Sequence, residues 1–529
     1  MQAGTIGVLA LLFASAAHAG PSLRTVAFAE DHYAFDAVPG FRVLSTPYIN
    51  DLGAVAFSAG ADVLSEAGTL EFSYGIWVDG PDGAQIAIGE HDFPALEAPE
   101  ITRTFGLVNF NNVGALAIVS TENAPGPGGI TDSLWLDNAN GLTHIAREGD
   151  PMPSGDGVID RVSRVSMNAH SDLLLTLHPQ GGSTSRASLW EYTGGSFAPR
   201  VLPGAPSTGV DGIPLVGAAH YVYNDAGEAA FRGLLDTDHP SVGFDSNDVM
   251  VRSSRDGATG VSREGDFAPG YEALPFSSMR TPGMNNAGRL AFAAYLSTDS
   301  GVPFRSANGL FVDDGDGVRV IIGANTPVPG RPGRVFVGAD DVIVNGRGDV
   351  VFIGGDDSPA DFYPGGDIGV FRWRDDAIEP IATAGDTPLA DHSVVITDFL
   401  EGLSSNARGD IVMEAVVGSD APGMSFSHEH AIVAYDALAE NLVQIVRTGM
   451  LFDVGTPGAP DLRTITRIEF ATGSGMQDGR ARGLNESGEI AFYLEFDDFS
   501  SGVFVATIPT PGGAVPCIIA LALTRRRRS

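Results

Sequence analysis

The chain has 529 residues, 43% of them hydrophobic, with 68 Gly and 33 Pro. This composition can bury a large core while the chain turns often, which favours short strands over long helices. Lys and Arg number 31 against 66 Asp and Glu, and the net charge of -35 argues against nucleic acid and anionic membranes as partners. Cationic partners, including divalent metals, are compatible with this charge, as is simple solubility outside the cell.

The first 19 residues predict a signal peptide. An apolar run at residues 6–14 precedes Ala17-His18-Ala19, the small-x-small pattern that signal peptidase recognises, so cleavage is expected after Ala19. The apolar run is too short to span a bilayer. The sequence therefore predicts an exported protein whose mature domain begins at residue 20.

A phrase of the form Asn-x-x-Gly recurs along the chain, as in "NDAGEAAF" at residues 224–231, and each copy is followed by an apolar run. One copy has Ser171 in place of the glycine. An Asn side chain can bond its own backbone two residues on, and Gly takes a positive φ at little cost, so each copy predicts a structural turn between two strands rather than a catalytic motif. The eight asparagines are Asn50, Asn111, Asn168, Asn224, Asn285, Asn345, Asn406 and Asn485.

Each repeat unit contains four short predicted strands, which we call a to d. Strands a and b flank the Asn-x-x-Gly turn, strand c ends in phrases such as "SLW" at residues 133–135, and strand d in phrases such as "IAREGD" at residues 145–150. Eight such units predict an all-β fold, namely a β-propeller of about eight four-stranded blades. An open β-solenoid built from the same units is the alternative.

The two ends of the repeat region favour the closed ring. The last unit stops at strand c, in "SGVFVATIP", and has no strand d of its own. A matching strand d instead begins the mature chain, in "LRTVAFAED". The N-terminal strand is therefore expected to complete the last blade, which removes an exposed sheet edge and makes residues 20–508 one propeller domain.

Residues 509–529 predict a C-terminal sorting and anchor tail. Pro509 and Pro511 break the chain, a short apolar stretch with the only cysteine, Cys517, follows, and Arg525, Arg526, Arg527 and Arg528 form a positive stop. This order of parts resembles the PEP-CTERM tails of exported bacterial proteins, and the mature chain resembles an uncharacterised class of exported bacterial repeat proteins. The resemblance implies a processing protease of the exosortase type, transient membrane anchoring and a place on the cell surface or outside the cell. It supplies no activity.

Alternating strand direction assigns the connections to two faces. The b–c and d–a connections share one face, which we call the loop face, and the a–b and c–d turns share the other, which we call the turn face. Connections on the loop face are long and differ between units, as in "DTDHPSVGFDSND" and "GDDSPADFYPGGD". Variable loops on a rigid scaffold usually carry binding, so the loop face is the expected functional face.

The loop-face connections are acidic, and two interpretations stay open. Carboxylates with nearby backbone carbonyls suit Ca²⁺, which makes Ca²⁺ the candidate cofactor. A solvated acidic rim is the preferred interpretation, because acidic loops are expected in so negative a protein. The candidate metal ligands are Asp356, Asp357, Asp361 and Asp367, and the same connections carry Asp236, Asp238, Asp245, Asp248 and Asp420.

Three further segments contain residues that are typical of binding sites. "DDGDG" at residues 313–317 resembles a Ca²⁺ loop but lies on a c–d turn, so turn chemistry is the preferred interpretation. "HEH" at residues 428–430 places two imidazoles on one side of a strand, which is a weak metal motif without a third ligand. The insertion at 450–483 contains "TGSGMQDGRARG", whose glycines fit neither Rossmann nor P-loop spacing.

Two classes of function follow. The preferred one is a displayed binding or structural propeller that engages envelope or matrix polysaccharide or a surface protein, with or without Ca²⁺. The alternative is an extracellular polysaccharide hydrolase or lyase with Asp or Glu pairs at the propeller mouth. No loop concentrates the Arg, Tyr and His that usually position a substrate beside such pairs, so the sequence favours a protein that is not an enzyme and identifies no catalytic residue.

Overall fold

The computed structural model describes residues 22–30, 40–64, 70–80, 83–93, 102–123, 130–181, 187–243, 246–271, 274–297, 307–356, 367–385, 394–419, 429–455, 459–474 and 477–508. Within these ranges the regular structure is β, apart from two single-turn 3-10 helices, η1 (Glu90–Asp92) and η2 (Pro206–Thr208). No helix in the described part of the chain has the length and apolar character needed to cross a bilayer.

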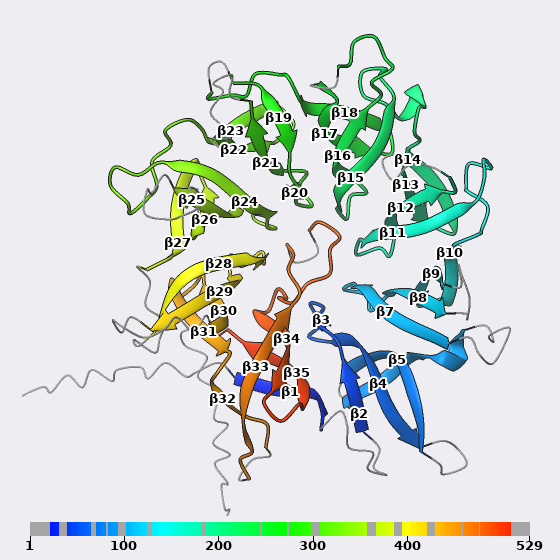
Figure 1. The fold of residues 1–529 in the computed structure, drawn as a ribbon, viewed down its shortest axis with the longest axis vertical. Helices are drawn as coiled ribbons and strands as arrows, with labels where there is room; N and C mark the ends of the chain where they lie inside the picture. Colours follow the sequence, from blue (N-terminus) through cyan, green and yellow to red (C-terminus); the bar gives the residue numbers. More distant parts are fainter. Residues whose placement is uncertain are drawn as a thin grey trace, which may run out of the picture.

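Eight antiparallel sheets stand as blades around a central axis (Figure 1). We number the blades 1 to 8 in chain order, so that blade 1 begins at β2 and blade 8 begins at β32. In blades 1 to 7 the first strand lies nearest the axis and the later strands lie progressively farther out, whereas in blade 8 the short β32 lies away from the axis and β33 takes the inner place. The predicted propeller is thereby confirmed and the open solenoid excluded.

The strands of blades 1 to 4 have the following bounds. Blade 1 contains β2 (Gly40–Leu44), β3 (Tyr48–Ile49), β4 (Val55–Leu64), β5 (Leu70–Gly80) and β6 (Gly83–Gly89). Blade 2 contains β7 (Thr102–Phe110), β8 (Leu116–Asn123), β9 (Ile130–Asn138) and β10 (Gly141–Arg147). Blade 3 contains β11 (Ile159–Met167), β12 (Leu173–Pro179), β13 (Ser188–Thr193) and β14 (Ser196–Val201). Blade 4 contains β15 (Leu215–Tyr223), β16 (Ala229–Leu235), β17 (Asp248–Ser254) and β18 (Gly257–Arg263).

The remaining blades follow the same order. Blade 5 contains β19 (Phe276–Met279), β20 (Gly283–Met284), β21 (Leu290–Leu296), β22 (Ala307–Asp313) and β23 (Val318–Ile322). Blade 6 contains β24 (Phe336–Val344), β25 (Val350–Asp356), β26 (Asp367–Arg374) and β27 (Ala377–Thr383). Blade 7 contains β28 (Val394–Ser405), β29 (Ile411–Ser419), β30 (Glu429–Asp436) and β31 (Asn441–Arg447). Blade 8 contains β32 (Leu451–Asp453), β33 (Leu462–Phe470), β34 (Glu489–Phe496) and β35 (Ser501–Thr507).

Blade 8 closes the ring with the N-terminal strand, as the sequence predicted. Strand β1 (Ser22–Ala29) pairs antiparallel with β35, with Ser22 opposite Thr507 and Ala29 opposite Ser501. The amide of Ile508 donates to the carbonyl of Gly488 at 2.8 Å. The first and last strands of the propeller therefore lie side by side, and the outer edge of blade 8 is completed by β1.

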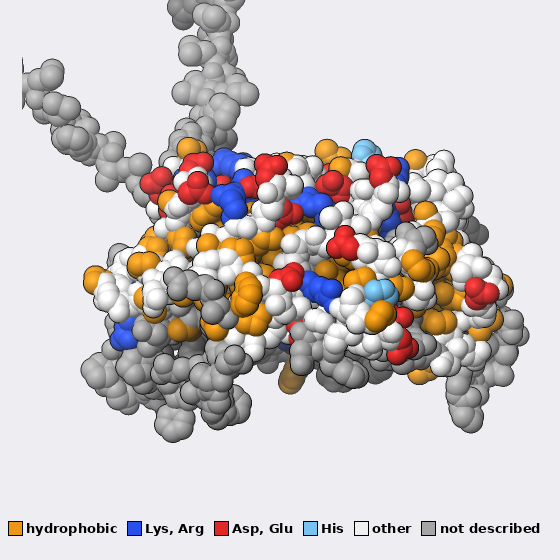
Figure 2. Space-filling model, turned by 90° about the horizontal axis from the view of Figure 1, so that it is seen from above, with side chains coloured by type: hydrophobic (Ala, Val, Ile, Leu, Met, Phe, Trp, Pro, Cys, Tyr) orange, Lys and Arg blue, Asp and Glu red, His pale blue; other side chains and the backbone are white. Residues whose placement is uncertain are grey.

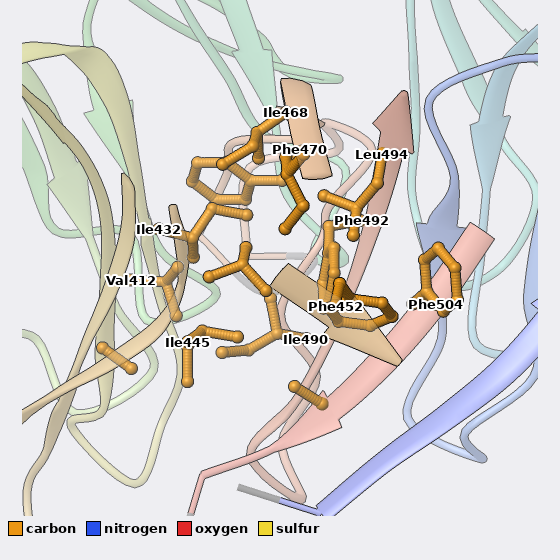
Figure 3. Packing of buried hydrophobic residues seen from close by; sticks show 14 of the residues in the cluster. Val412, Ile432, Ile445, Phe452, Ile468, Phe470, Ile490, Phe492, Leu494 and Phe504 are labelled. Carbon is orange, nitrogen blue, oxygen red and sulfur yellow. The ribbon is translucent and has the colours of Figure 1, made fainter. Parts of the chain in front are cut away.

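A recurring aromatic group fills blades 5, 6 and 8. In blade 5, Phe276 meets Phe311 edge to face at 4.9 Å, and Phe292 stacks on Phe311 at 5.6 Å. Blades 6 and 8 repeat this arrangement, and Figure 3 shows Phe452, Phe492 and Phe504 in blade 8. Such ring pairs add about 0.5–1.5 kcal/mol each beyond area burial. The repeated "AF" and "GVF" phrases thus encode a repeated core.

Hydrophobic clusters also join neighbouring blades. The cluster in Figure 3 combines Val412 and Ile432 of blade 7 with Ile468 and Ile490 of blade 8, all of them buried. Since each blade buries one face against the next, the ring is held by a continuous series of such clusters.

The acidic surface is interspersed with arginine. Figure 2 views the flattened disc edge-on and shows red and blue side chains mixed together, most densely along its upper side. Glu122, for example, accepts from Arg103 at 2.6 Å and from Arg147 at 2.9 Å. All 31 basic residues of the chain are arginine, and none is lysine. Arginine can form several directed hydrogen bonds at once, which suits this use.

Candidate functional site in the central channel

The eight repeated asparagines lie at the turns between the first and second strands, and their side chains are buried next to the axis. Each Oδ1 accepts the backbone amide four positions on, and six of the eight also accept the amide two positions on, as Asn285 does from Arg289 at 3.0 Å and Ala287 at 3.1 Å. The glycine amide donates back to the asparagine carbonyl, and Ser171, which replaces it in blade 3, takes the left-handed conformation with φ 65°. The motif therefore shapes a tight turn with a buried polar side chain.

The same asparagines bond from blade to blade. Asn285 Nδ2 donates to the carbonyl of Asn345 at 3.0 Å, and Asn485 Nδ2 donates to the carbonyl of Asn50 at 3.1 Å, which joins the last blade to the first. Equivalent bonds run from Asn50 to Asn111, Asn111 to Asn168, Asn224 to Asn285 and Asn406 to Asn485. We call this set the asparagine ring. Its six bonds link blades 7, 8, 1, 2 and 3 in one series and blades 4, 5 and 6 in another.

A segment of blade 8 reaches into the middle of the ring (Figure 1). We call residues 471–474 and 477–484 the plug. Its carbonyls accept inner-strand amides from Ile49 at 3.0 Å, Met167 at 2.9 Å, Tyr223 at 2.8 Å and Ser405 at 3.2 Å. Each of these amides belongs to the residue just before a ring asparagine, on the edge of a sheet. The plug therefore pairs backbone groups that the channel would otherwise leave unpaired.

Arg482 fixes the plug to blades 1 and 2. Its side chain is 0% exposed. It donates to the Ile49 carbonyl at 3.1 Å, to Asn112 Oδ1 at 2.6 Å and to Asp51 Oδ1 at 2.6 Å. Burial lowers the pKa of the Arg482 guanidinium, while Asp51 and Glu486 oppose this effect. A buried cation with these partners holds the plug in one position.

A second set of bonds runs through the residue after each ring asparagine. The Asp225 amide donates to Asn286 Oδ1 at 2.9 Å, and the Glu486 amide donates to Asp51 Oδ1 at 2.9 Å. Blade 6 has Gly346 at this position, with no side chain to accept. The amide of Asn286 in blade 5 therefore has no side-chain acceptor in blade 6, and it donates at 3.1 Å to Oε1 of Gln477 in the plug instead.

A small polar cavity lies beside the plug. It measures about 170 Å³ and is lined by inner-strand residues of blades 5 and 6 and by one plug residue, namely Arg280, Thr281, Asp340, Asp341, Val342 and Arg480, together with Ala293. Arg280 forms an ion pair with Asp340, and Arg480 forms one with Asp478 at 2.5 Å. The lining thus has two cations, Arg280 and Arg480, and two anions, Asp340 and Asp341, and Asp478 pairs with Arg480 from outside the lining.

Bulges in the inner strands border this level of the channel. Arg164, His220 and Asp341 each lie four residues before a ring asparagine and have φ of 44°, 52° and 44°. Asp341 Oδ2 accepts the amides of Gly402 at 3.0 Å and Leu403 at 2.8 Å in the next blade. A positive φ is unfavourable for residues with a side chain, so the surrounding contacts must enforce it. Bulges commonly redirect side chains near functional sites.

His220 holds a neutral imidazole at this level. Its Nδ1 lies 3.1 Å from Oγ1 of Thr281, a cavity residue of the next blade. Burial lowers the pKa of His220, and the positive charges of Arg164 and Arg232 lower it further. The ring is therefore uncharged at neutral pH and can accept or donate a proton.

The predicted metal ligands are not brought together among the described residues. Asp356 ends β25, is buried, and lies 3.4 Å from Arg331. Asp367 begins β26. Asp357 and Asp361 lie outside the described residues. In the part of the chain that the structure describes, no group of three or more His, Cys, Asp or Glu is arranged to hold a metal ion. The Ca²⁺ site stays a prediction.

The other acidic and histidine candidates have local partners where they are described. Asp248 is buried and accepts from Arg232 at 2.8 Å, and Asp236 accepts the Asp238 amide at 3.0 Å. Asp313 accepts the Gly315 amide at 3.0 Å, which is turn chemistry. His430 lies 3.4 Å from Glu414. Asp245, Asp420 and His428 fall outside the described residues, as do Ala17, Ala19, Pro509, Pro511 and Arg525 to Arg528.

Sequence reasoning missed the plug, the blade-to-blade asparagine bonds and the bulges. The 79-residue spacing between Asn406 and Asn485 was the available signal for the plug, because the other spacings are 56 to 61 residues. The three bulges share a position, four residues before Asn168, Asn224 and Asn345, but not a residue type.

These features define an eight-bladed β-propeller whose channel is crossed by a plug from the last blade. The chain belongs to a family of unknown function (DUF7453), whose model matches residues 16–193 and 183–515. Comparison with curated proteins finds no match.

Among solved structures, the Dos1 propeller is similar at 11% identity and a TM-score of 0.36, with 92% of this chain and 94% of that chain covered. A polysaccharide lyase of family PL25, an ulvan lyase, matches at 10% identity and a TM-score of 0.31, covering 79% and 92%. The α-L-arabinanase of Penicillium chrysogenum matches at 11% identity and a TM-score of 0.28, covering 67% and 95%. At these scores the similarities carry no information about activity.

Proposed function

We propose that the protein is an exported binding propeller that recognises a neutral, hydroxyl-rich polysaccharide at the loop-face side of the plugged channel. The observation that carries this proposal is the strained bulge at Asp341, which lines the polar cavity, together with the bulge at His220, which contacts the cavity residue Thr281. Backbone outliers of this kind cost about 1–3 kcal/mol each and cluster at ligand sites. Asp341 and His220 also have a structural role, because each forms a hydrogen bond to the neighbouring blade.

The charges around the cavity favour a neutral ligand. Arg280 is paired with Asp340, and Arg480 with Asp478, so donors and carboxylate oxygens stand next to each other without a large net charge. Sugar hydroxyls both donate and accept, and they match such an arrangement. A volume of about 170 Å³ is below the roughly 300 Å³ of ordinary ligand pockets, so the cavity suits one sugar unit or chain end.

Binding is favoured over hydrolysis because both cavity carboxylates are already engaged by the protein. Asp340 faces a guanidinium, and Asp341 accepts two backbone amides. A general acid or base must instead reach the reacting atoms of the substrate with a free oxygen. A polysaccharide lyase is the second candidate, because the neutral His220 beside the cavity could act as a base.

Several parts of the proposal come from the sequence. They are export through residues 1–19, processing of residues 509–529 by an exosortase-type protease, transient membrane anchoring, a final place at the cell surface or outside the cell, and a contribution of Ca²⁺ on the loop face. The partner is an extracellular polysaccharide, and a surface protein is the alternative partner.

The decisive experiment measures binding of neutral and acidic bacterial polysaccharides to the purified mature domain by calorimetry. Arg280→Met with Asp340→Leu removes one cavity pair together, so no unpaired charge is left behind. We expect at least a tenfold loss of affinity for the neutral ligand. The matched control is Arg447→Met with Glu429→Leu, which removes an ion pair of similar exposure in blade 7 and should leave binding unchanged.

Three results would change the proposal. Equal binding by the cavity variant and its control would remove the cavity from the site. Release of new sugar chain ends that carry a C=C double bond, lost on His220→Gln while binding is retained, would identify a lyase. Addition of millimolar Ca²⁺ should raise affinity or the melting temperature if Ca²⁺ takes part, and Asp356→Asn with Asp357→Asn should reduce that gain.

A further inference from the structure

Both ends of the described propeller leave from the turn face. Ile508 donates its amide to Gly488, which belongs to the turn of Asn485 in the asparagine ring. Ser22 lies opposite Thr507 in the closing strand pair. Whatever follows residue 508 therefore starts at the level of the asparagine turns and at the opposite end of the strands from the loop face.

We propose that the turn face lies against the cell envelope to which the chain is attached, and that the loop face points away from it. This inference rests on the proposed export and C-terminal attachment. Processing of the tail removes the apolar stretch that begins at Ala514, so the residue through which the mature chain is attached lies no farther along than residues 509–513. An extended chain spans at most about 3.3–3.6 Å per residue, so the attachment point lies within roughly 20 Å of Ile508.

A tether of this length cannot bring the loop face to the same surface. The inner strand β11 spans nine residues, Ile159–Met167, which at about 3.3 Å per residue separates the two faces by roughly 30 Å before the connections are added. The tether is shorter than this separation. An upright propeller can therefore touch the envelope with its turn face only.

Hydrogen bonds between neighbouring blades connect the turns of the turn face. Arginines of one blade donate to turn carbonyls of the next, as Arg200 does to Gly227 at 2.8 Å and Arg289 to Gly348 at 2.6 Å. Arg408 likewise donates to Ser487 at 2.6 Å. The exposed apolar side chains on this face include Leu52 at 81% and Leu438 at 68%. Contact with the envelope would cover them.

Single cysteines test the orientation, because the domain at residues 20–508 contains none and Cys517 is the only one in the chain. Leu52→Cys marks the turn face, and Phe499→Cys, at a position that is 66% exposed between β34 and β35, marks the loop face. Leu438→Cys and Phe267→Cys form a second pair in other blades. Each variant is treated with a bulky, membrane-impermeant maleimide on intact cells of the native host and after release of the protein. The unchanged protein gives the background.

We expect the loop-face cysteines to react on intact cells as fast as after release, and the turn-face cysteines to react at least tenfold more slowly on intact cells. Equal rates for both faces on intact cells would overturn the orientation while leaving export and binding standing. If none of the four cysteine variants reacts on intact cells and all react normally after lysis, the protein is not exported, and the proposed orientation fails with the proposed export. Protection of only one turn-face position would indicate a tilted disc and contradict the upright orientation.

Discussion

Replacing Arg482 with methionine tests whether the plug clamps the ring of blades. The arginine donates to three acceptors in blades 1 and 2, the carbonyl of Ile49 and the side chains of Asn112 and Asp51. Methionine keeps much of the apolar stem and leaves these acceptors without their donor. Breaking a buried pair costs about 3–5 kcal/mol, and the partial exposure of Asp51 places the expected loss at the lower end, about 3 kcal/mol.

This loss converts to a measurable melting shift. Unfolding entropy is about 2.1 cal/mol/K per residue, which over roughly 490 residues gives about 1 kcal/mol/K. The Arg482→Met domain should therefore melt about 3 °C below the wild type in scanning calorimetry. Arg467→Met is the control, since Arg467 is 57% exposed and pairs with Glu469 and Glu495 in the same blade. A surface pair of this kind is worth about 1 kcal/mol or less.

Proteolysis gives a second readout of the clamp. Arg480 is a potential tryptic site inside the plug, and release of the plug should speed cleavage there in Arg482→Met but not in Arg467→Met. If the two variants melt alike and are cut alike, the plug does not depend on Arg482, and the reasoning from its buried hydrogen bonds is refuted.

Three further predictions concern closure, the asparagine ring and acid stability. Deleting Leu23–Asp31 removes β1 and should cause aggregation or a large loss of melting temperature, because blade 8 keeps an open edge; an unchanged transition would contradict closure by β1. Asn285→Asp retains the turn acceptor but loses the donor to Asn345, so a loss of about 1–3 kcal/mol is expected, against none for the exposed turn substitution Asn140→Asp. Although burial opposes it, hydrogen bonds from Arg255 and Tyr223 hold the pKa of Glu191 below its ordinary value of 4.5. The fold therefore favours ionised Glu191, which stabilises the protein above pH 4.5, and this stabilisation is lost as the pH falls through the lower pKa of the folded state. In Glu191→Gln the melting temperature should depend less on pH in this range. An unchanged pH dependence would show that Glu191 does not contribute.

The fold was predictable because its information is local and repeated. The Asn-x-x-Gly motif at Asn224 and Gly227 predicts a turn within four residues. Eight copies of this motif at nearly equal spacing predict eight equivalent structural units. Closure was also predictable, because the amino-acid sequence alone shows that the last unit lacks strand d and that residues 22–29 form an extra strand. These features depend on backbone preferences that a short segment expresses by itself.

The candidate site was not predictable in the same way. Arg482 is an arginine in a glycine-rich insertion, and only the closed ring surrounds it with Asp51 and Asn112, 431 and 370 positions earlier in the chain (482 − 51 = 431; 482 − 112 = 370). The bulges at Arg164, His220 and Asp341 share a position but no side-chain chemistry, so no pattern of residue types marks them. Contacts between blades come from the assembled ring, and a single unit does not encode them.

The pairing of β1 with β35 also means that the first strand must wait for the last strand to be synthesised before the ring can close. Ser22 meets Thr507, which is translated 485 residues later (507 − 22 = 485). At roughly 5–20 residues per second, synthesis leaves the first strand without its partner for about 25–100 s. During that interval every growing chain presents the same unpaired strand as every other growing chain of its kind, so correct closure competes with pairing between chains. The length of the middle blades, rather than the sequence of the closing strands, determines how long that competition lasts.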